Sequence, residues 1–191
     1  MAQRAHHVPY SEYLALEASG DGKHDYVAGM VYAMAGGTPE HARLKAALSL
    51  ALGAALRGKP CAVYSSDLRV RIEATDRSTY PDVTVVCGAL KTSAVDNDAV
   101  INPTLLVEVT SESTEANDRG EKFGHYREIP SLQEYVIVSG RTPRVEVWRR
   151  NDRGRWELTD EAGPEGAVHL ASIDVRVDAA EIYRDPLAAP A

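Results

Sequence analysis

The chain has 191 residues, of which 44% are hydrophobic and 26% are charged, a composition typical of a globular protein with one sizeable core. Its net charge of −7 argues against sequence-independent binding of nucleic acid over a broad basic surface, but leaves room for a local basic cleft. No apolar run approaches the about 18 residues of a membrane span, and residues 1–9 lack the apolar core of a signal peptide. We therefore expect one cytoplasmic domain over residues 1–191, with free, buried thiols at Cys61 and Cys87.

The first sixty residues predict a helix, a β-hairpin and a second, longer helix. Residues 11–17 favour a helix that Ser11 can cap, and residues 24–34 predict two short strands around a turn. Thr38 is a good N-cap for a helix in which leucine and alanine recur at helical spacing until Gly58 ends it.

The middle and end of the chain predict mostly strands. Residues 68–72 alternate strictly, so Arg69 and Arg71 are expected on a polar face. We expect a turn at residues 76–78 and a polar loop over residues 88–102. Apolar or alternating runs predict the other strands at residues 61–64, 80–86, 105–109, 132–138, 145–149, 156–159 and 168–177.

One more helix is predicted over residues 113–128. Within it Asp118, Lys122 and Tyr126 are four residues apart, so they should share one face. A last helical turn over residues 178–183 precedes a tail rich in alanine and proline that we expect to be loose. The order of helices and strands predicts an α/β or α+β fold with a central mixed sheet.

Two acidic residues stand on strands that are otherwise apolar. Glu108 lies within the run Leu105–Val109, and Asp82 lies at the entry of the strand over residues 80–86. An ionised carboxylate in such a place is unfavourable unless it is paired or binds a metal. Mg²⁺ usually takes one or two protein carboxylates. If the two faces coincide, both acids could share one cation that activates a water for attack on a phosphodiester.

Other interpretations of these residues remain open. Glu108 could form a structural ion pair with Arg69, Arg71 or Lys122, and Asp82 could be a strand-entry cap. Lys122, on the following helix, is the nearest lysine after Glu108 and could complete the site. It could instead be a solvated residue that pairs with Asp118. For the remaining candidates the ordinary role is favoured: core packing for Tyr126, a turn or strand-end cap for Asp67, and surface or packing for His41.

Several short segments, taken in order and spacing, resemble the Uma2-type endonucleases (DUF820), a bacterial branch of the PD-(D/E)xK nuclease superfamily. The resemblance extends roughly from Ser11 to Tyr183, and no single motif is specific alone. The segments are Tyr13-Leu14, Lys23-His24-Asp25-Tyr26, Ala35-Gly36-Gly37-Thr38-Pro39-Glu40-His41, Asp67-Leu68-Arg69-Val70, Pro81-Asp82, Leu106-Val107-Glu108-Val109-Thr110-Ser111-Glu112-Ser113-Thr114, Asp118-Arg119-Gly120-Glu121-Lys122, Tyr126 and Ile129-Pro130-Ser131-Leu132-Gln133-Glu134-Tyr135.

The resemblance implies a restriction-endonuclease-like core, in which a central mixed β-sheet is flanked by helices and carries added β-hairpins. It implies Asp82 and Glu108 as ligands of Mg²⁺ or Mn²⁺, Lys122 as the catalytic lysine moved onto the helix, and Asp25 as an assisting acid. The sequence departs from the family pattern at Thr110, where the parent motif has lysine, and at Asp25, where glutamate is usual. A nucleic-acid substrate, DNA before RNA, and a homodimer are also implied.

Three functional hypotheses follow. The first is a metal-dependent endonuclease that hydrolyses phosphodiester bonds by water attack. The second is a nuclease-fold protein that binds nucleic acid or a protein partner without cutting, which Thr110 and the acidic net charge motivate. The third is an unrelated oligomeric scaffold. The sequence contains no P-loop, no HExxH zinc motif and no Gly-x-Ser-x-Gly elbow.

Overall fold

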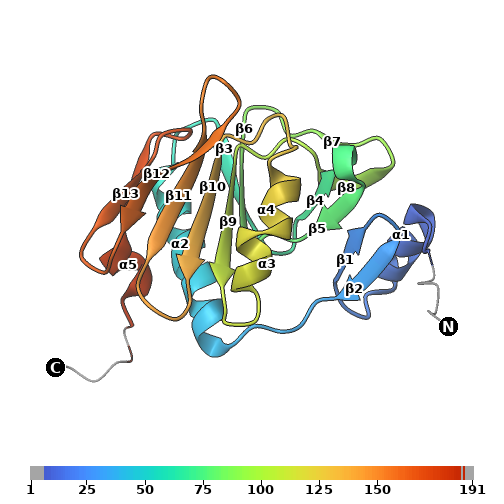
Figure 1. The fold of residues 1–191 in the computed structure, drawn as a ribbon, viewed down its shortest axis with the longest axis horizontal. Helices are drawn as coiled ribbons and strands as arrows, with labels where there is room; N and C mark the ends of the chain where they lie inside the picture. Colours follow the sequence, from blue (N-terminus) through green and yellow to red (C-terminus); the bar gives the residue numbers. More distant parts are fainter. Residues whose placement is uncertain (1–6, 186, 188–191) are drawn as a thin grey trace.

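The computed structural model describes residues 7–185 and residue 187; most of the tail expected to be loose therefore lies outside the described residues. Two six-stranded sheets and several helices make up a mixed α+β fold, which confirms the predicted class (Figure 1). No helix among these residues is long and apolar enough to cross a membrane.

The central sheet has the strand order β12-β11-β10-β9-β6-β3. Strands β9 and β10 are parallel, and the other neighbours are antiparallel, so the sheet is mixed as predicted. Its strands are β3 (Cys61–Ser65), β6 (Val83–Cys87), β9 (Leu105–Thr110), β10 (Glu134–Ser139), β11 (Val145–Arg150) and β12 (Trp156–Ala162).

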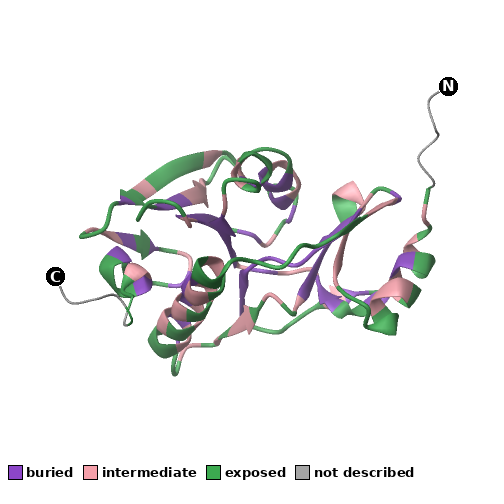
Figure 2. Cartoon of the chain, turned by 90° about the horizontal axis from the view of Figure 1, so that it is seen from below, coloured by how far each residue is buried: buried purple, intermediate pink, exposed green. Residues whose placement is uncertain are grey.

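Helices cover both faces of the central sheet. On one face α2 (Pro39–Ala55), α5 (Ala179–Tyr183) and the hairpin of β13 (Ala167–Leu170) and β14 (Val175–Asp178) enclose an aliphatic core. On the other face lie α3 (Glu115–Arg119) and α4 (Glu121–Tyr126), and Phe123 and Tyr126 of α4 pack into a core of mixed aliphatic and aromatic side chains. In Figure 2 the buried residues follow the strands, and the exposed ones lie on the outer sides of the helices.

Helix α2 forms where its sequence predicts. The Thr38 hydroxyl accepts the amide of His41 at 3.2 Å, which is the expected N-cap. Leu44, Leu48 and Leu52 recur at helical spacing and are buried against the central sheet. The helix therefore presents its first turn, including His41, at one end of that sheet (Figure 1).

A second sheet has the order β2-β1-β5-β4-β8-β7, and the sequence did not predict it. The hairpin over residues 24–34 is confirmed, but residues 77–79 form a strand rather than a turn, and residues 88–102 contain two strands rather than only a loop. Residues 77–78 pair with residues 26–27, and residues 99–100 pair with residues 69–70, so the order of this sheet depends on distant segments that local patterns do not report. The strands are β1 (His24–Val27), β2 (Met30–Ala33), β4 (Arg69–Ile72), β5 (Arg77–Thr79), β7 (Thr92–Ser93) and β8 (Asp96–Val100).

The expected polar face of β4 is buried, which corrects the prediction for Arg69 and Arg71. Helix α1 (Tyr10–Ser19) lies over this face, and Pro9 rather than Ser11 is its N-cap residue. The Arg71 guanidinium lies 4.0 Å from the ring centroid of Tyr10. Alternation thus identified the strand correctly, but the polar side chains face another element instead of solvent.

The helix predicted over residues 113–128 is divided into α3 and α4 at Gly120. A β-carbon at Gly120 would lie 2.9 Å from the carbonyl oxygen of Ala116, so the chain passes too close there for a larger residue. Asp118, Lys122 and Tyr126 nevertheless share a buried face, as their spacing predicts. At the final helix Asp178 occupies the N-cap position, although its side chain makes no capping hydrogen bond.

Cys61 and Cys87 form a disulfide, so the expectation of free thiols was wrong. The two residues are register partners on the adjacent antiparallel strands β3 and β6. Paired positions on one face have β-carbons close enough to bridge. The two cysteines are 26 positions apart in the sequence, and no local pattern indicates this register.

Opening this disulfide is expected to lower the free energy of unfolding by about 3 kcal/mol, because the bridge closes a long loop in the unfolded chain. Urea unfolding with and without dithiothreitol measures the difference. The double variant Cys61→Ala/Cys87→Ala should show the same loss and no further response to reductant. A midpoint that reductant leaves unchanged would contradict the prediction.

Candidate functional site

Asp82 and Glu108 meet at the end of the central sheet where β9 leads into α3 (Figure 1). Val83 of β6 pairs with Val107 of the antiparallel β9. One position further toward the end of the sheet, the same register brings Asp82 opposite Glu108. Opposite residues of such a pair have their side chains on the same face. The Val109 amide donates to Asp82 Oδ2 at 2.8 Å, which fixes this carboxylate against β9.

Glu108 is 3% exposed and is held by two groups from α4. The Lys122 ammonium lies 2.7 Å from Glu108 Oε1, and the Tyr126 hydroxyl donates to the same oxygen at 2.6 Å. Asp118 Oδ1 lies 3.7 Å from Lys122 Nζ. The face predicted from the spacing on this helix therefore points at Glu108. Tyr126 does more than pack, because its hydroxyl orients the carboxylate.

Burial raises the pKa of Glu108 to about 8, and the nearby charges of Asp82 and Asp118 add to this effect against the opposing Lys122. Burial also raises the pKa of Asp118, and Lys122 acts to lower it. Burial is the larger effect, so the pKa of Asp118 is raised. Burial alone would lower the pKa of Lys122, but Glu108, Asp118 and Asp25 outweigh it and raise the pKa. The site thus groups three acidic side chains around one ammonium, and they favour its charged form.

Asp82 also contacts two residues of α2. His41 Nε2 lies 3.2 Å from Asp82 Oδ2, and Lys45 Nζ lies 3.1 Å from Asp82 Oδ1. Burial acts to raise the pKa of Asp82, but His41, the Val109 amide and Lys45 together lower it. Asp82 is therefore held as an ionised carboxylate.

Sequence reasoning missed Lys45 and favoured an ordinary role for His41. The available signal was their spacing, since residues four apart on a helix share one face. Gly37 accommodates His41, because a β-carbon there would lie 2.5 Å from His41 Nδ1. The absence of a side chain at Gly37 thus leaves room for the imidazole that reaches Asp82.

Asp25 lies on β1 of the second sheet, and its ion pair is with Arg77. The Arg77 guanidinium donates to Asp25 Oδ2 at 3.2 Å, whereas Asp25 Oδ1 is buried without a hydrogen-bond partner among the described residues. Asp25 raises the pKa of Lys122, so it adds to the negative field around the ammonium. Asp67 lies apart from these acids, on the turn after β3, where it pairs with Lys23.

The donor set at the sheet end fits Mg²⁺ or Mn²⁺ better than Zn²⁺. It offers two opposed carboxylates, and Glu108 Oε2 forms no hydrogen bond with the described residues. Within the described part of the chain, no three His, Cys, Asp or Glu side chains are grouped as a metal site. Structural zinc generally needs four such ligands, whereas Mg²⁺ takes one or two carboxylates and completes its shell with water and substrate oxygens.

The arrangement of the mixed sheet and its flanking helices is shared with a solved structure. A solved structure titled as a putative nuclease belonging to DUF820, from Anabaena variabilis, superposes with a TM-score of 0.73 and covers 92% of this chain and 97% of its own. Its sequence identity of 16% supports the fold alone.

The particular family follows from the sequence. Residues 10–178 match Uma2, described as "Putative restriction endonuclease", and the chain belongs to this family. Two uncharacterized proteins of Synechocystis are relatives: slr1290 is 36% identical over 91% of this chain and 90% of its own length, and sll1609 is 32% identical over 86% and 93%.

Proposed function

We propose that this protein is a Mg²⁺- or Mn²⁺-dependent endonuclease that hydrolyses phosphodiester bonds, in DNA rather than RNA. The observation that carries the proposal is the position of Asp82 opposite Glu108, with the Lys122 ammonium 2.7 Å from Glu108. Membership of the Uma2 family, with its description as restriction endonucleases, supports a nucleic-acid substrate.

Asp82 and Glu108 would hold the cation between two adjacent strands that cannot easily move apart. A bound divalent ion supplies a water of lowered pKa and stabilises negative charge on the phosphate. Lys122 is buried beside Glu108, so its charge acts through little solvent, where electrostatic stabilisation is strongest. Tyr126 orients Glu108, and Asp25 favours the charged form of Lys122.

The direct test is the conversion of supercoiled plasmid DNA to its nicked form. The purified protein should nick in Mg²⁺ and stop when EDTA is added. Lys122→Met should lower the nicking rate by about 100-fold, the usual effect of removing one group that stabilises transition-state charge. Mn²⁺ binding, measured by titration calorimetry, should persist in this variant, because both carboxylates remain.

The matched control is Lys91→Met, which removes an exposed lysine from the loop just before β7 and should nick like the wild type. Nicking by Lys122→Met at the wild-type rate would contradict the role of Lys122. A wild-type protein that neither nicks nor takes up Mn²⁺ would favour the alternative, a nuclease-fold protein that binds without cutting.

A further inference from the structure

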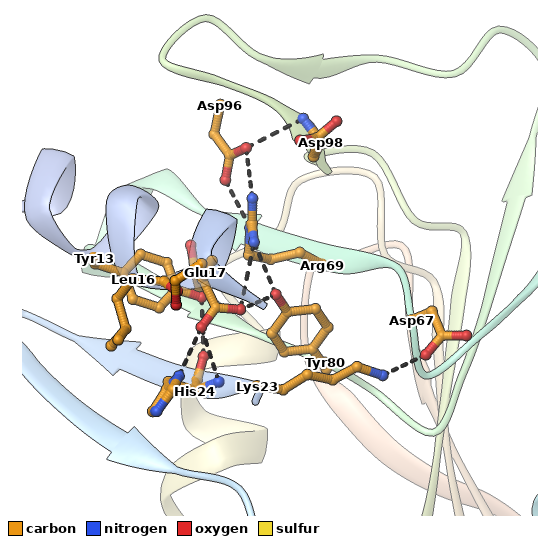
Figure 3. Close-up of polar contacts among 12 residues, drawn as sticks. Tyr13, Leu16, Glu17, Lys23, His24, Asp67, Arg69, Tyr80, Asp96 and Asp98 are labelled. Atoms are coloured by element: carbon orange, nitrogen blue, oxygen red, sulfur yellow. Dashed lines mark hydrogen bonds and ion pairs between the residues drawn. The ribbon is translucent and has the colours of Figure 1, made fainter. Parts of the chain in front are cut away.

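Two lysines from separate segments converge on one serine beside Asp82. Lys23, which precedes β1, donates to the Ser66 carbonyl at 2.9 Å, and Lys45 of α2 donates to the Ser66 hydroxyl at 2.9 Å. Figure 3 shows Lys23 extended along the Tyr80 ring to Asp67. The two ammonium groups are thus held in fixed positions, although neither residue was expected at the site.

Each ammonium group retains a hydrogen-bond donor. A lysine has three N–H donors. Lys23 uses two, on the Ser66 carbonyl and Asp67. Lys45 uses one, on the Ser66 hydroxyl, and also forms an ion pair with Asp82 at 3.1 Å, so it too keeps at least one donor. The side chains are 38% and 24% exposed, so a ligand in solvent can reach them. Two positive groups with spare donors beside a proposed catalytic carboxylate are suited to a phosphate.

A groove of about 800 Å³ continues from this point between α2 and β3. Ser49 and Ser65 line its near end; Ser65 adjoins Ser66, and the Ser49 hydroxyl donates to the Lys45 carbonyl at 2.9 Å. Arg57 lines the far end. Ser49 and Arg57 are eight positions apart along α2 and the turn that follows it. At the helical rise this is about 12 Å, or about three nucleotide steps at the rise of a DNA strand.

The charge of this groove favours an anionic chain over a peptide. Its lining includes no Asp or Glu, although the whole chain has a net charge of −7. Arg57 is exposed and has no ion-pair partner among the described residues. Lys59 also lines the groove, but its ammonium donates to the Ile173 carbonyl at 3.0 Å and pairs with Asp174, so we do not count it.

We propose that Lys45 and Lys23 bind the phosphate next to the one that is cut, and that the nucleic-acid strand continues along the α2–β3 groove to Arg57. This inference rests on the proposed function, because it takes the site at Asp82 as the point of cleavage. It assigns the groove to one strand of the substrate and gives three cations that hold it.

The test is the binding of a fluorescein-labelled single-stranded 20-nucleotide DNA in EDTA, followed by fluorescence anisotropy from 0.05 to 0.3 M salt. Lys23→Gln, Lys45→Gln and Arg57→Gln should each weaken binding about fivefold at 0.1 M salt. Each should also reduce the slope of log K against log salt by about 0.7, the value for one lost phosphate contact. Arg155→Gln, which removes an exposed arginine from the β11–β12 turn, is the charge-matched control.

Wild-type affinity and slope in Lys23→Gln and Lys45→Gln would overturn the proposal, as would an equal loss in Arg155→Gln. A wild-type protein that ignores the DNA but binds an extended peptide along the edge of β3 would also overturn it. Plasmid nicking by the same variants separates the two proposals. If DNA binding depends on the lysines but the wild type does not nick, the binding site is supported and the proposed nuclease function is contradicted. If the wild type nicks and all three variants bind DNA normally, only the proposed binding site is contradicted.

Discussion

Asp82→Asn is expected to abolish metal-dependent nicking and to weaken Mn²⁺ binding by more than about 100-fold, since even partners of a metal ligand contribute about 10- to 100-fold to affinity. The substitution keeps the size of the side chain, and its amide oxygen can still accept from the Val109 amide. It removes the negative charge that a divalent cation requires. Titration calorimetry with Mn²⁺ and plasmid nicking measure the two effects.

The fold should survive this substitution, so loss of activity can be attributed to the site. A thermal melt within a few degrees of the wild type is the required check. Asp98→Asn, which neutralises an exposed acid on β8, is the matched control and should bind and nick normally. Continued nicking by Asp82→Asn, or equal losses in both variants, would show that the cation is held elsewhere.

Asp96→Asn is expected to lower the free energy of unfolding by about 3 to 5 kcal/mol, the cost of breaking a buried ion pair from one side. Arg69 donates to Asp96 through Nε at 2.8 Å and through Nη2 at 2.9 Å, and the Tyr10 hydroxyl donates at 2.8 Å (Figure 3 shows the Arg69–Asp96 pair). The variant removes the acid that accepts both hydrogen bonds from Arg69 and leaves this buried charge with Glu17 alone, whose Oε2 lies 3.6 Å from Nη1. Urea unfolding at pH 7 gives the loss.

A second variant tests this reason. In Arg69→Met/Asp96→Leu both charges are removed, so the double variant should be more stable than Asp96→Asn although it has two substitutions. Equal or greater destabilisation in the double variant would mean that the pair contributes through its hydrogen bonds to Tyr10 and Tyr80 instead.

The same ion pair predicts a pH window. Burial acts to raise the pKa of Asp96, but the hydrogen bonds from Arg69 and Tyr10 outweigh it, and the pKa is lowered. The pKa of Asp96 is thus lower in the folded than in the unfolded protein, where it is about 3.9. The stability that Asp96 contributes is therefore complete above this unfolded-state pKa, and it is lost as the pH falls through the folded-state pKa. The difference between wild type and Asp96→Asn should stay constant from about pH 7 to 5 and shrink below about pH 4.

The cluster around Arg69 also connects the second sheet to the site. Arg69 Nη1 donates to the Tyr80 hydroxyl at 2.8 Å, and Tyr80 in turn donates to Glu17 of α1 (Figure 3). Tyr80 lies two residues before Asp82. The buried network therefore fixes the chain just before the carboxylate that we propose to bind metal.

The sequence alone determined the elements whose signals are local. The N-cap at Thr38 with its leucine spacing gave α2, and the four-residue spacing of Asp118, Lys122 and Tyr126 gave the face that meets Glu108. The two acids were recognisable because a carboxylate on an apolar strand is unfavourable without a partner. The single-domain organisation, the homodimer and the preference for DNA stay predictions.

Only the tertiary structure decided which distant segments lie side by side. The pairing of β5 with β1 and of β8 with β4 joins segments far apart in the chain, and the Cys61–Cys87 bridge depends on the register of β3 with β6. The convergence of Lys23, Lys45 and Ser66 near Asp82 has the same origin. Helical and strand periodicity report how a segment meets its immediate surroundings, whereas register and sheet order arise from contacts that no short stretch of sequence encodes.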